Sequence, residues 1–164
     1  MPSLAPPERL DGGRWLILDG LQDPGNVGAI WRTADALGAD GLLLVHRCAD
    51  PFSPKTVRAT MGACFRLPVY ELEAEALPGL LSRSVLPLYA AALRADTRDI
   101  RGARLSRCAV AIGSEGRGVS PELLDISEQT VKIPMRARCE SLNAAVAAAV
   151  ILWEMARQSG GGPA

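Results

Sequence analysis

Residues 109–118 read Ala-Val-Ala-Ile-Gly-Ser-Glu-Gly-Arg-Gly, so that an apolar run passes directly into a glycine-rich loop. A short apolar run bounded by turn residues is typical of a buried strand. Ligands collect at the carboxyl ends of parallel strands, and glycines let the backbone approach a ligand closely. The spacing G-x-x-G-x-G differs from the dinucleotide fingerprint G-x-G-x-x-G, which disfavours a pyrophosphate cradle. By itself this segment predicts either a ligand-binding loop at a strand end or an ordinary tight turn.

Apolar runs of the same kind recur along the chain, with segments of helical character between most of them. Strands are predicted at 15–18, 41–45, 67–70, 85–91, 109–112 and 130–133, and helices at 26–37, 53–61, 71–82 and 141–158. Alternating strands and helices require crossover connections, so the expected fold class is α/β, with a mostly parallel sheet flanked by helices. A chain of 164 residues has the length of one domain.

The last predicted helix lacks a polar face. Between Leu142 and Trp153 its only polar side chain is Asn143, and many of the other positions are alanine. A helix that is apolar all round has to be buried all round. The sheet can cover one side, and a second copy of the chain would cover the other, so we expect a homodimer through the final helix. The alternative is a central helix that is covered within one subunit.

Composition excludes several classes of protein. No apolar run is long enough to span a membrane, and residues 1–11 lack the apolar core of a signal peptide, which predicts a cytoplasmic protein. The cysteines, at positions 48, 64, 108 and 139, form no C-x-x-C pair, and His46 is the only histidine, so no metal site is expected. Net charge is zero, which argues against indiscriminate nucleic-acid binding and requires any RNA-binding surface to be local or supplied by another subunit or domain.

Two further segments carry residues that suit a site. Residues 26–32 read Asn-Val-Gly-Ala-Ile-Trp-Arg; Asn26 is a candidate helix N-cap, and Arg32 follows among apolar neighbours. The other segment contains Ile133-Pro134-Met135 and then Glu140-Ser141-Leu142-Asn143. Its apolar side chains would form walls for a flat ring such as adenine, and Ser141 would cap the last helix.

In this order, the three segments resemble the signature motifs of the SpoU family, the TrmH-type branch of the SPOUT RNA ribose 2′-O-methyltransferases. The resemblance covers residues 16–157. It implies S-adenosylmethionine as methyl donor, tRNA or rRNA as acceptor, and a deep C-terminal trefoil knot. It also implies a single catalytic domain over residues 1–158 and a flexible tail over 159–164. Many relatives carry an N-terminal RNA-binding domain, whereas this chain starts at the catalytic region, which implies either a minimal enzyme or a part of a larger one.

The same resemblance implies roles for individual residues. The catalytic set would be Arg32, Asn26, Glu115, Ser141 and Asn143. The cofactor would bind against Leu88, Ala91, Ala92, Gly113, Glu115, Gly116, Gly118, Ile133, Met135 and Leu142. Arg32 would either take the proton of the ribose hydroxyl or hold the RNA phosphate and stabilise the nascent alkoxide, and Glu115 would orient its guanidinium.

A functional alternative is a catalytically inactive knotted module that binds RNA or assists assembly. The presence of Asn26, Arg32, Glu115 and Asn143 together argues against it. Local charge suggests RNA contacts at Arg9, Arg14, Arg47, Lys55, Arg58, Arg136 and Arg138.

Overall fold

The computed structural model describes residues 5–139 and 141–160, and within them the chain forms one seven-stranded sheet. The strands are β1 (Arg14–Asp19), β2 (Gly41–Val45), β3 (Val69–Glu71), β4 (Leu88–Ala91), β5 (Arg98–Asp99), β6 (Cys108–Gly113) and β7 (Gln129–Lys132). Their order is β3-β2-β1-β6-β4-β7-β5, and every neighbouring pair is parallel. The predicted α/β class with a parallel sheet is therefore confirmed.

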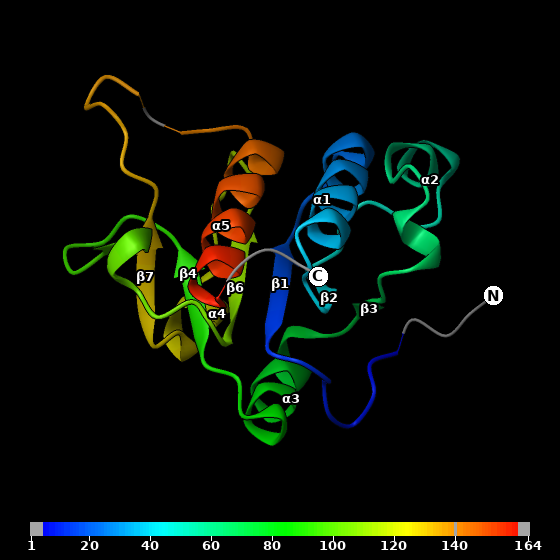
Figure 1. Ribbon diagram of the computed structural model, residues 1–164, viewed down its shortest axis with the longest axis horizontal. Helices are drawn as coiled ribbons and strands as arrows, with labels where there is room; N and C mark the ends of the chain where they lie inside the picture. Colours follow the sequence, from blue (N-terminus) through cyan, green and yellow to red (C-terminus); the bar gives the residue numbers. More distant parts are fainter. Residues whose placement is uncertain (1–4, 140, 161–164) are drawn as a thin grey trace.

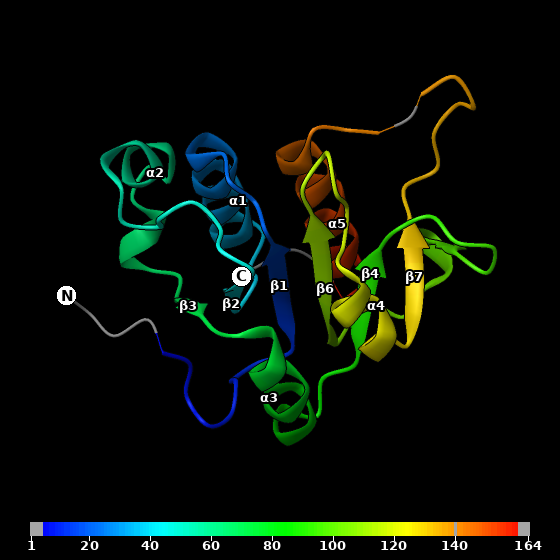
Figure 2. The same cartoon turned by 180° about the vertical axis from the view of Figure 1, so that it is seen from behind.

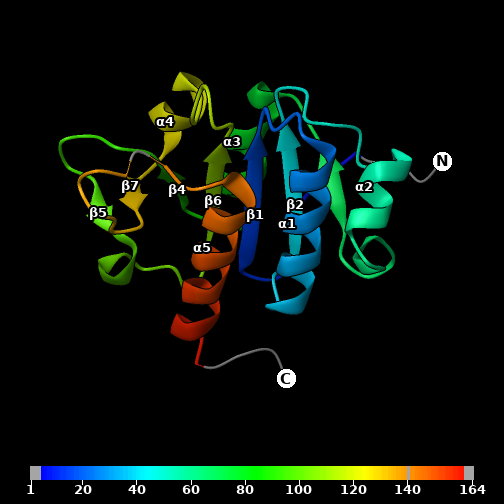
Figure 3. The same cartoon turned by 90° about the horizontal axis from the view of Figure 1, so that it is seen from above.

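Helices cover both faces of this sheet. On one face α1 (Pro24–Ala36) and α5 (Ala144–Gln158) lie side by side, with α2 (Pro54–Ala59) beyond α1 (Figure 1). The opposite face carries α3 (Leu77–Ser84) and α4 (Pro121–Ile126) (Figure 2). The view from above shows the sheet between these two layers (Figure 3). Short 3-10 helices lie at Ala63–Phe65 (η1), Ala74–Ala76 (η2) and Ile100–Gly102 (η3).

Each face of the sheet has its own apolar core. Successive strand residues point to opposite faces, so Leu16 and Leu18 pack in the cluster that includes the buried residues of α1 and α5. Trp15 and Ile17 pack in the second cluster, with the leucines of α3. Both faces of β1 are buried, which explains why its sequence is apolar without alternation.

The starts of two helices differ from the predictions. Asp23, not Asn26, caps α1, because its carboxylate accepts the N–H groups of Gly25 and Asn26. Pro24 fixes this start, since proline suits the first helical position, where no N–H bond is needed. The cap of α5 is Asn143 and not Ser141, for the Asn143 amide oxygen accepts the N–H groups of Ala145 and Val146. In both cases the helix begins at a different residue from the one predicted.

The region between β3 and β4 was also predicted incorrectly. A helix was expected from 71 to 82, but β3 extends to Glu71 and α3 begins only at Leu77. Pro78 lies in the first turn of α3, where its missing N–H costs nothing, and so it helps to start the helix instead of interrupting it. Helix α4 and the two-residue strand β5 were not predicted.

Several strand ends and helix starts meet at one edge of the sheet. The strands β4, β6 and β7 end at the same edge, where α1 and α5 begin (Figure 1). Helix α5 is covered on one side by the sheet and by α1, whereas Val146 and Trp153 on its other side are 50% and 61% exposed. The apolar last helix therefore keeps one side uncovered within a single chain. None of the helices in the described part of the chain combines the length and apolar character needed to cross a bilayer.

Candidate functional site

The glycine-rich loop folds back on the end of β6. Gly118 donates its N–H to the Ser114 carbonyl at 2.8 Å, and the two residues form an isolated bridge. A Cβ at Gly113 would collide with the backbone of Gly118 and Val119. Gly118 has φ +67°, in the left-handed region that glycine adopts without strain. The tight reversal thus requires glycine at positions 113 and 118, and this reversal also forms part of a pocket.

The pocket lies beside this loop, at the carboxyl ends of β4, β6 and β7. It is lined by eight of the ten residues predicted to bind the cofactor: Ala91, Ala92, Gly113, Glu115, Gly118, Ile133, Met135 and Leu142. Further walls, which the sequence did not identify, come from Leu93, Ile100, Ile112, Val131, Lys132, Ala144, Ala147 and Ile151. The lining is mostly apolar, with Glu115 and Ser141 at polar positions, which suits a flat, largely apolar ligand with a polar rim. Glu140 lies outside the described residues.

Two of the residues predicted for this pocket lie elsewhere. Leu88 is buried in the core cluster on the α3 side of the sheet, because β4 directs Leu88 and Ala90 to that face and Tyr89 and Ala91 to the other. Gly116 lies on the far side of the glycine-rich loop and lines a second, polar pocket.

Three segments that are far apart in the sequence meet in one polar cluster. The Glu115 carboxylate oxygen Oε1 accepts from the Asn143 side-chain amide at 3.2 Å and from the Ala144 N–H at 3.2 Å. The same Asn143 amide nitrogen donates to Asn26 Oδ1 at 3.4 Å. A carboxylate at the first turn of α5 is favoured by the helix dipole. The cluster of Asn26, Glu115 and Asn143 therefore joins all three sequence motifs at the edge of the apolar pocket.

Arg32 lies apart from this cluster within the single chain. It is six residues beyond Asn26, which corresponds to about 9 Å along the axis of α1. Its side chain is exposed and makes no hydrogen bond or ion pair with any described residue. The expected contact from Glu115 to Arg32 is not formed, because Glu115 is bonded to the start of α5. Of the predicted catalytic residues, Asn26, Glu115 and Asn143 are brought together, and Ser141 lines the neighbouring pocket.

A second, polar pocket lies on the other side of the glycine-rich loop. It contains the pair His46 and Asp19, whose Nδ1 and Oδ1 atoms are 2.6 Å apart, and Asp19 Oδ2 also accepts the Ser120 N–H at 2.7 Å. The hydrogen bond with Asp19 raises the pKa of His46, an effect that partial burial opposes and the carboxylate of Glu122 reinforces. No sequence pattern predicts this pair, because the two residues meet only when β1 and β2 lie side by side.

Cysteines and acidic residues form no metal site in the part of the chain that the structure describes. Cys108 is buried, Cys48 and Cys64 are partly buried, and Cys139 is exposed. Burial raises the pKa of the Cys108 thiol to about 12 and that of Cys48 to about 11, so neither is a reactive thiolate at neutral pH.

Comparison with known proteins identifies relatives along nearly the whole chain. The sequence profile of the SpoU rRNA Methylase family matches residues 13–153. An uncharacterised tRNA/rRNA methyltransferase from Synechocystis sp. is 41% identical over 147 residues, covering 87% of this chain and 53% of that protein. The 23S rRNA (guanosine(2553)-2′-O)-methyltransferase RlmP from Bacillus subtilis is 34% identical over 151 residues, covering 92% of this chain and 61% of that enzyme.

A solved structure shows the same architecture. The SpoU methyltransferase AviRb from Streptomyces viridochromogenes, in complex with its cofactor AdoMet, matches with a TM-score of 0.86 and 33% identity, covering 96% of this chain and 66% of that one. The chain thus spans about half to two thirds of the length of these relatives.

Proposed function

We propose that this chain, which belongs to the SpoU rRNA Methylase family, transfers a methyl group from S-adenosylmethionine to a ribose 2′-hydroxyl of tRNA or rRNA. The observation that carries the proposal is the cluster of Asn26, Glu115 and Asn143 at the edge of an apolar pocket. The proposal also draws on AviRb, whose structure with AdoMet has the same fold.

The pocket fits the cofactor in the character of its walls. Ile133, Leu142 and Ile112 present apolar surface suited to an adenine ring, and the loop from Gly113 to Gly118 places backbone groups at its polar rim. When bound, S-adenosylmethionine supplies an activated methyl group, so the protein needs no covalent step of its own. The residues of the chain have to hold the acceptor ribose in line and accommodate the loss of its hydroxyl proton.

We assign the orientation of the ribose to Asn143 and Glu115. The Asn143 amide oxygen is occupied by the α5 cap, so its NH₂ group points outward, toward Glu115 and Asn26. Both hydrogens of that NH₂ group are donated within the cluster, so Glu115 and Asn26 offer the remaining acceptors for a ribose hydroxyl. Arg32 supplies a positive charge for the RNA phosphate and the developing alkoxide, because guanidinium groups stay protonated in proteins and make poor bases.

A homodimer completes this assignment. The exposed side of α5 presents Val146 and Trp153, and α1, which carries the exposed Arg32, packs directly beside α5. A second copy of the chain docked on these two helices would cover the apolar side chains and enclose Arg32. Trp153→Glu is expected to give a monomer in sedimentation velocity and to lose methyl transfer, whereas a persistent dimer would overturn the proposed interface.

The remaining expectations follow from family membership and are proposed with it. The segments from about 91 to 143 would form the deep trefoil knot, supported by the convergence of the β4, β6 and β7 ends with the start of α5. Residues 1–158 would form one catalytic domain with a tail beyond, of which 161–164 lie outside the described residues. The protein would act in the cytoplasm on RNA, without a metal ion.

The decisive experiment is transfer of labelled methyl from S-adenosylmethionine to bulk tRNA and rRNA, followed by nuclease digestion. Label on ribose is the expected result, and label on a base would overturn the proposed acceptor. Calorimetric titration with the methyl donor separates the enzyme from an inactive RNA-binding module. If the donor does not bind, the inactive module becomes the better description.

A further inference from the structure

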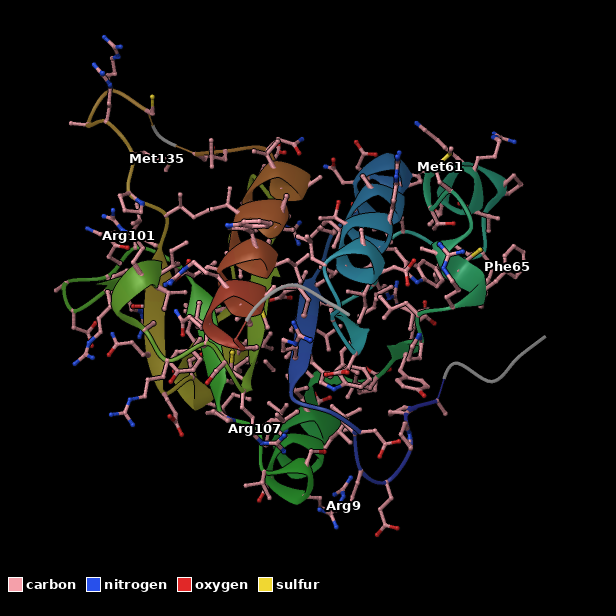
Figure 4. All side chains as sticks on the ribbon, in the orientation of Figure 1. Arg9, Met61, Phe65, Arg101, Arg107 and Met135 are labelled. Carbon is pink, nitrogen blue, oxygen red and sulfur yellow. The ribbon has the colours of Figure 1, made fainter. Side chains whose placement is uncertain are left out.

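The segment that follows α2 places two large apolar side chains at the protein surface. Phe65, the last residue of η1, is 87% exposed, and Met61 is 67% exposed. Both lie at the α2 end of the molecule, with Met61 near the top of α2 and Phe65 on the side that faces away from α5 (Figure 4). Phenylalanine is among the residues most often buried, so a ring this exposed, four residues from a second exposed apolar side chain, points to an interaction surface.

The backbone holds this surface in an unfavourable conformation. Met61 has φ +49° and Gly62 has φ +90°, so two consecutive residues lie in the left-handed region. Glycine adopts it freely, but methionine does not, because its Cβ approaches the following carbonyl oxygen. Strained residues of this kind gather at binding and catalytic sites.

Three cationic side chains lie in the same segment of the chain as the exposed ring. Lys55 and Arg58 project from α2, are exposed, and make no side-chain hydrogen bond or ion pair with other described residues. Arg66 directly follows Phe65 and is held by Asp35 of α1, with 2.8 Å between Nη2 and Oδ2. Asp35 neutralises the charge of Arg66, whereas Lys55 and Arg58 have no ion-pair partner among the described residues.

We propose that this surface, formed by Lys55, Arg58, Met61, Phe65 and Arg66 and called the α2 platform below, binds an unpaired stretch of the RNA. One base stacks on Phe65, and the neighbouring phosphates contact Lys55 and Arg58. The inference rests on the proposed function and adds to it an RNA contact outside the pocket. Unpaired RNA fits better than duplex, since the base faces of an A-form helix are stacked inside it.

A second copy of the chain fits the α2 platform less well. A two-fold contact brings the same patch of both copies together, so the unneutralised cations would face each other. The position of the platform also favours the substrate. Helix α2 packs against Gly28 of α1, where a Cβ would collide with Ala59, and α1 begins beside Asn26 of the polar cluster. RNA bound on α2 can therefore continue toward that cluster.

The test uses the full chain and two labelled probes, a single-stranded oligouridylate and a blunt RNA duplex, in fluorescence anisotropy titrations. Phe65→Leu keeps an apolar side chain but removes the aromatic face, and it is expected to weaken oligouridylate binding by roughly 5- to 150-fold, the range for loss of one base stack. Phe65→Trp should retain wild-type affinity. Binding of the duplex should be the same in all three proteins.

The cations are tested by the salt dependence of the same titration. Arg58→Ala should lower the slope of log K against log salt by about one, as expected for one lost phosphate contact. The control is Arg101→Ala, because Arg101 is exposed and lies on the opposite side of the molecule from Met61 and Phe65 (Figure 4). Its affinity and slope should match those of the wild type.

Several results would overturn the inference. It fails if Phe65→Leu binds oligouridylate as well as the wild type does, or if the wild type binds neither probe. It also fails if Phe65→Leu changes the sedimentation coefficient, which would make the platform a protein interface. Ribose methylation that persists at wild-type levels in Phe65→Leu would reject the platform and leave the proposed function intact. RNA binding that depends on Phe65, without any methyl transfer, would support the α2 platform and reject the proposed function.

Discussion

The side chain of Asn143 caps α5 with its oxygen and donates from its nitrogen to Glu115 Oε1 at 3.2 Å. One amide thus links the stability of the last helix to the position of a carboxylate at the pocket. Because the cap directs the amide oxygen toward the N–H groups of α5, the NH₂ group has to point toward Glu115 and Asn26. Substitutions at Asn143 can therefore affect the stability of α5 and the contact to Glu115 separately.

Substitutions at Asn143 should divide stability from activity. Asn143→Ala removes both the cap and the donor, and it should cost about 1 kcal/mol of unfolding free energy in urea titrations. Asn143→Ser keeps a capping oxygen, so its stability should be near that of the wild type, while the contact to Glu115 is lost. Both variants should show a large and similar loss of methyl transfer. Full activity in Asn143→Ser would mean that Asn143 serves only the helix.

Alanine substitutions at two glycines of one loop should differ in their effect on binding of the methyl donor. Gly113→Ala places a Cβ against the backbone of Gly118 and Val119, so the loop has to open and binding of the methyl donor should be lost. Gly116→Ala is the matched control, because its Cβ meets nothing within 4 Å and its φ is not positive. Calorimetric titration with S-adenosylmethionine measures both. Equal tolerance of the two substitutions would contradict the tight reversal.

Sequence reasoning was most successful where the local pattern decides the structure. The apolar runs and glycines placed Gly113 at a strand end. Asn26, Glu115 and Asn143 were singled out by the resemblance to the SpoU motifs, and their side chains are hydrogen-bonded to one another. It was less successful where two residues could serve equally. Asp23 and Asn26 are both good caps, and only the proline that follows Asp23 selects between them.

Other features depend on contacts that only the folded chain makes. Leu88 misses the pocket because neighbouring strand residues face opposite sides, so an error of one residue exchanges the faces. Strand β5 exists only by pairing with β7. The exposure of Phe65 reverses the usual expectation for phenylalanine, which is what a binding surface would require.

The pair of His46 and Asp19 should make stability depend on pH. The Asp19 contact raises the pKa of His46 in the folded state above its ordinary value of 6.5. A raised folded pKa means that the stabilisation is complete below about pH 6.5, the unfolded value, and is lost as pH rises through the folded value. The effect should be small, because the His46 side chain is 34% exposed. The urea midpoint of the wild type should therefore fall as the pH is raised from 6.5 through the folded pKa of His46.

The control for this prediction is His46→Gln, which retains a hydrogen-bonding side chain but does not titrate. Its urea midpoint should be flat over the same range of pH. Asp19→Asn should also lose the dependence, while its amide oxygen can still accept the Ser120 N–H. An unchanged pH dependence in His46→Gln would assign it to other groups.

Arg32 gives the sharpest test of the catalytic assignment. The residue is exposed in the single chain and binds no described partner, so Arg32→Ala should leave the urea midpoint and the binding of S-adenosylmethionine nearly unchanged. If the guanidinium stabilises the acceptor oxygen, methyl transfer should fall by roughly 10²- to 10³-fold, as for loss of one oxyanion donor. Arg32→Lys keeps the charge without the planar fork and should recover part of the rate. Exposed Arg104, in the segment between η3 and β6, provides the matched control as Arg104→Ala. An Arg32→Ala variant that transfers methyl at the wild-type rate would show that the exposed arginine is only a solvated charge on α1.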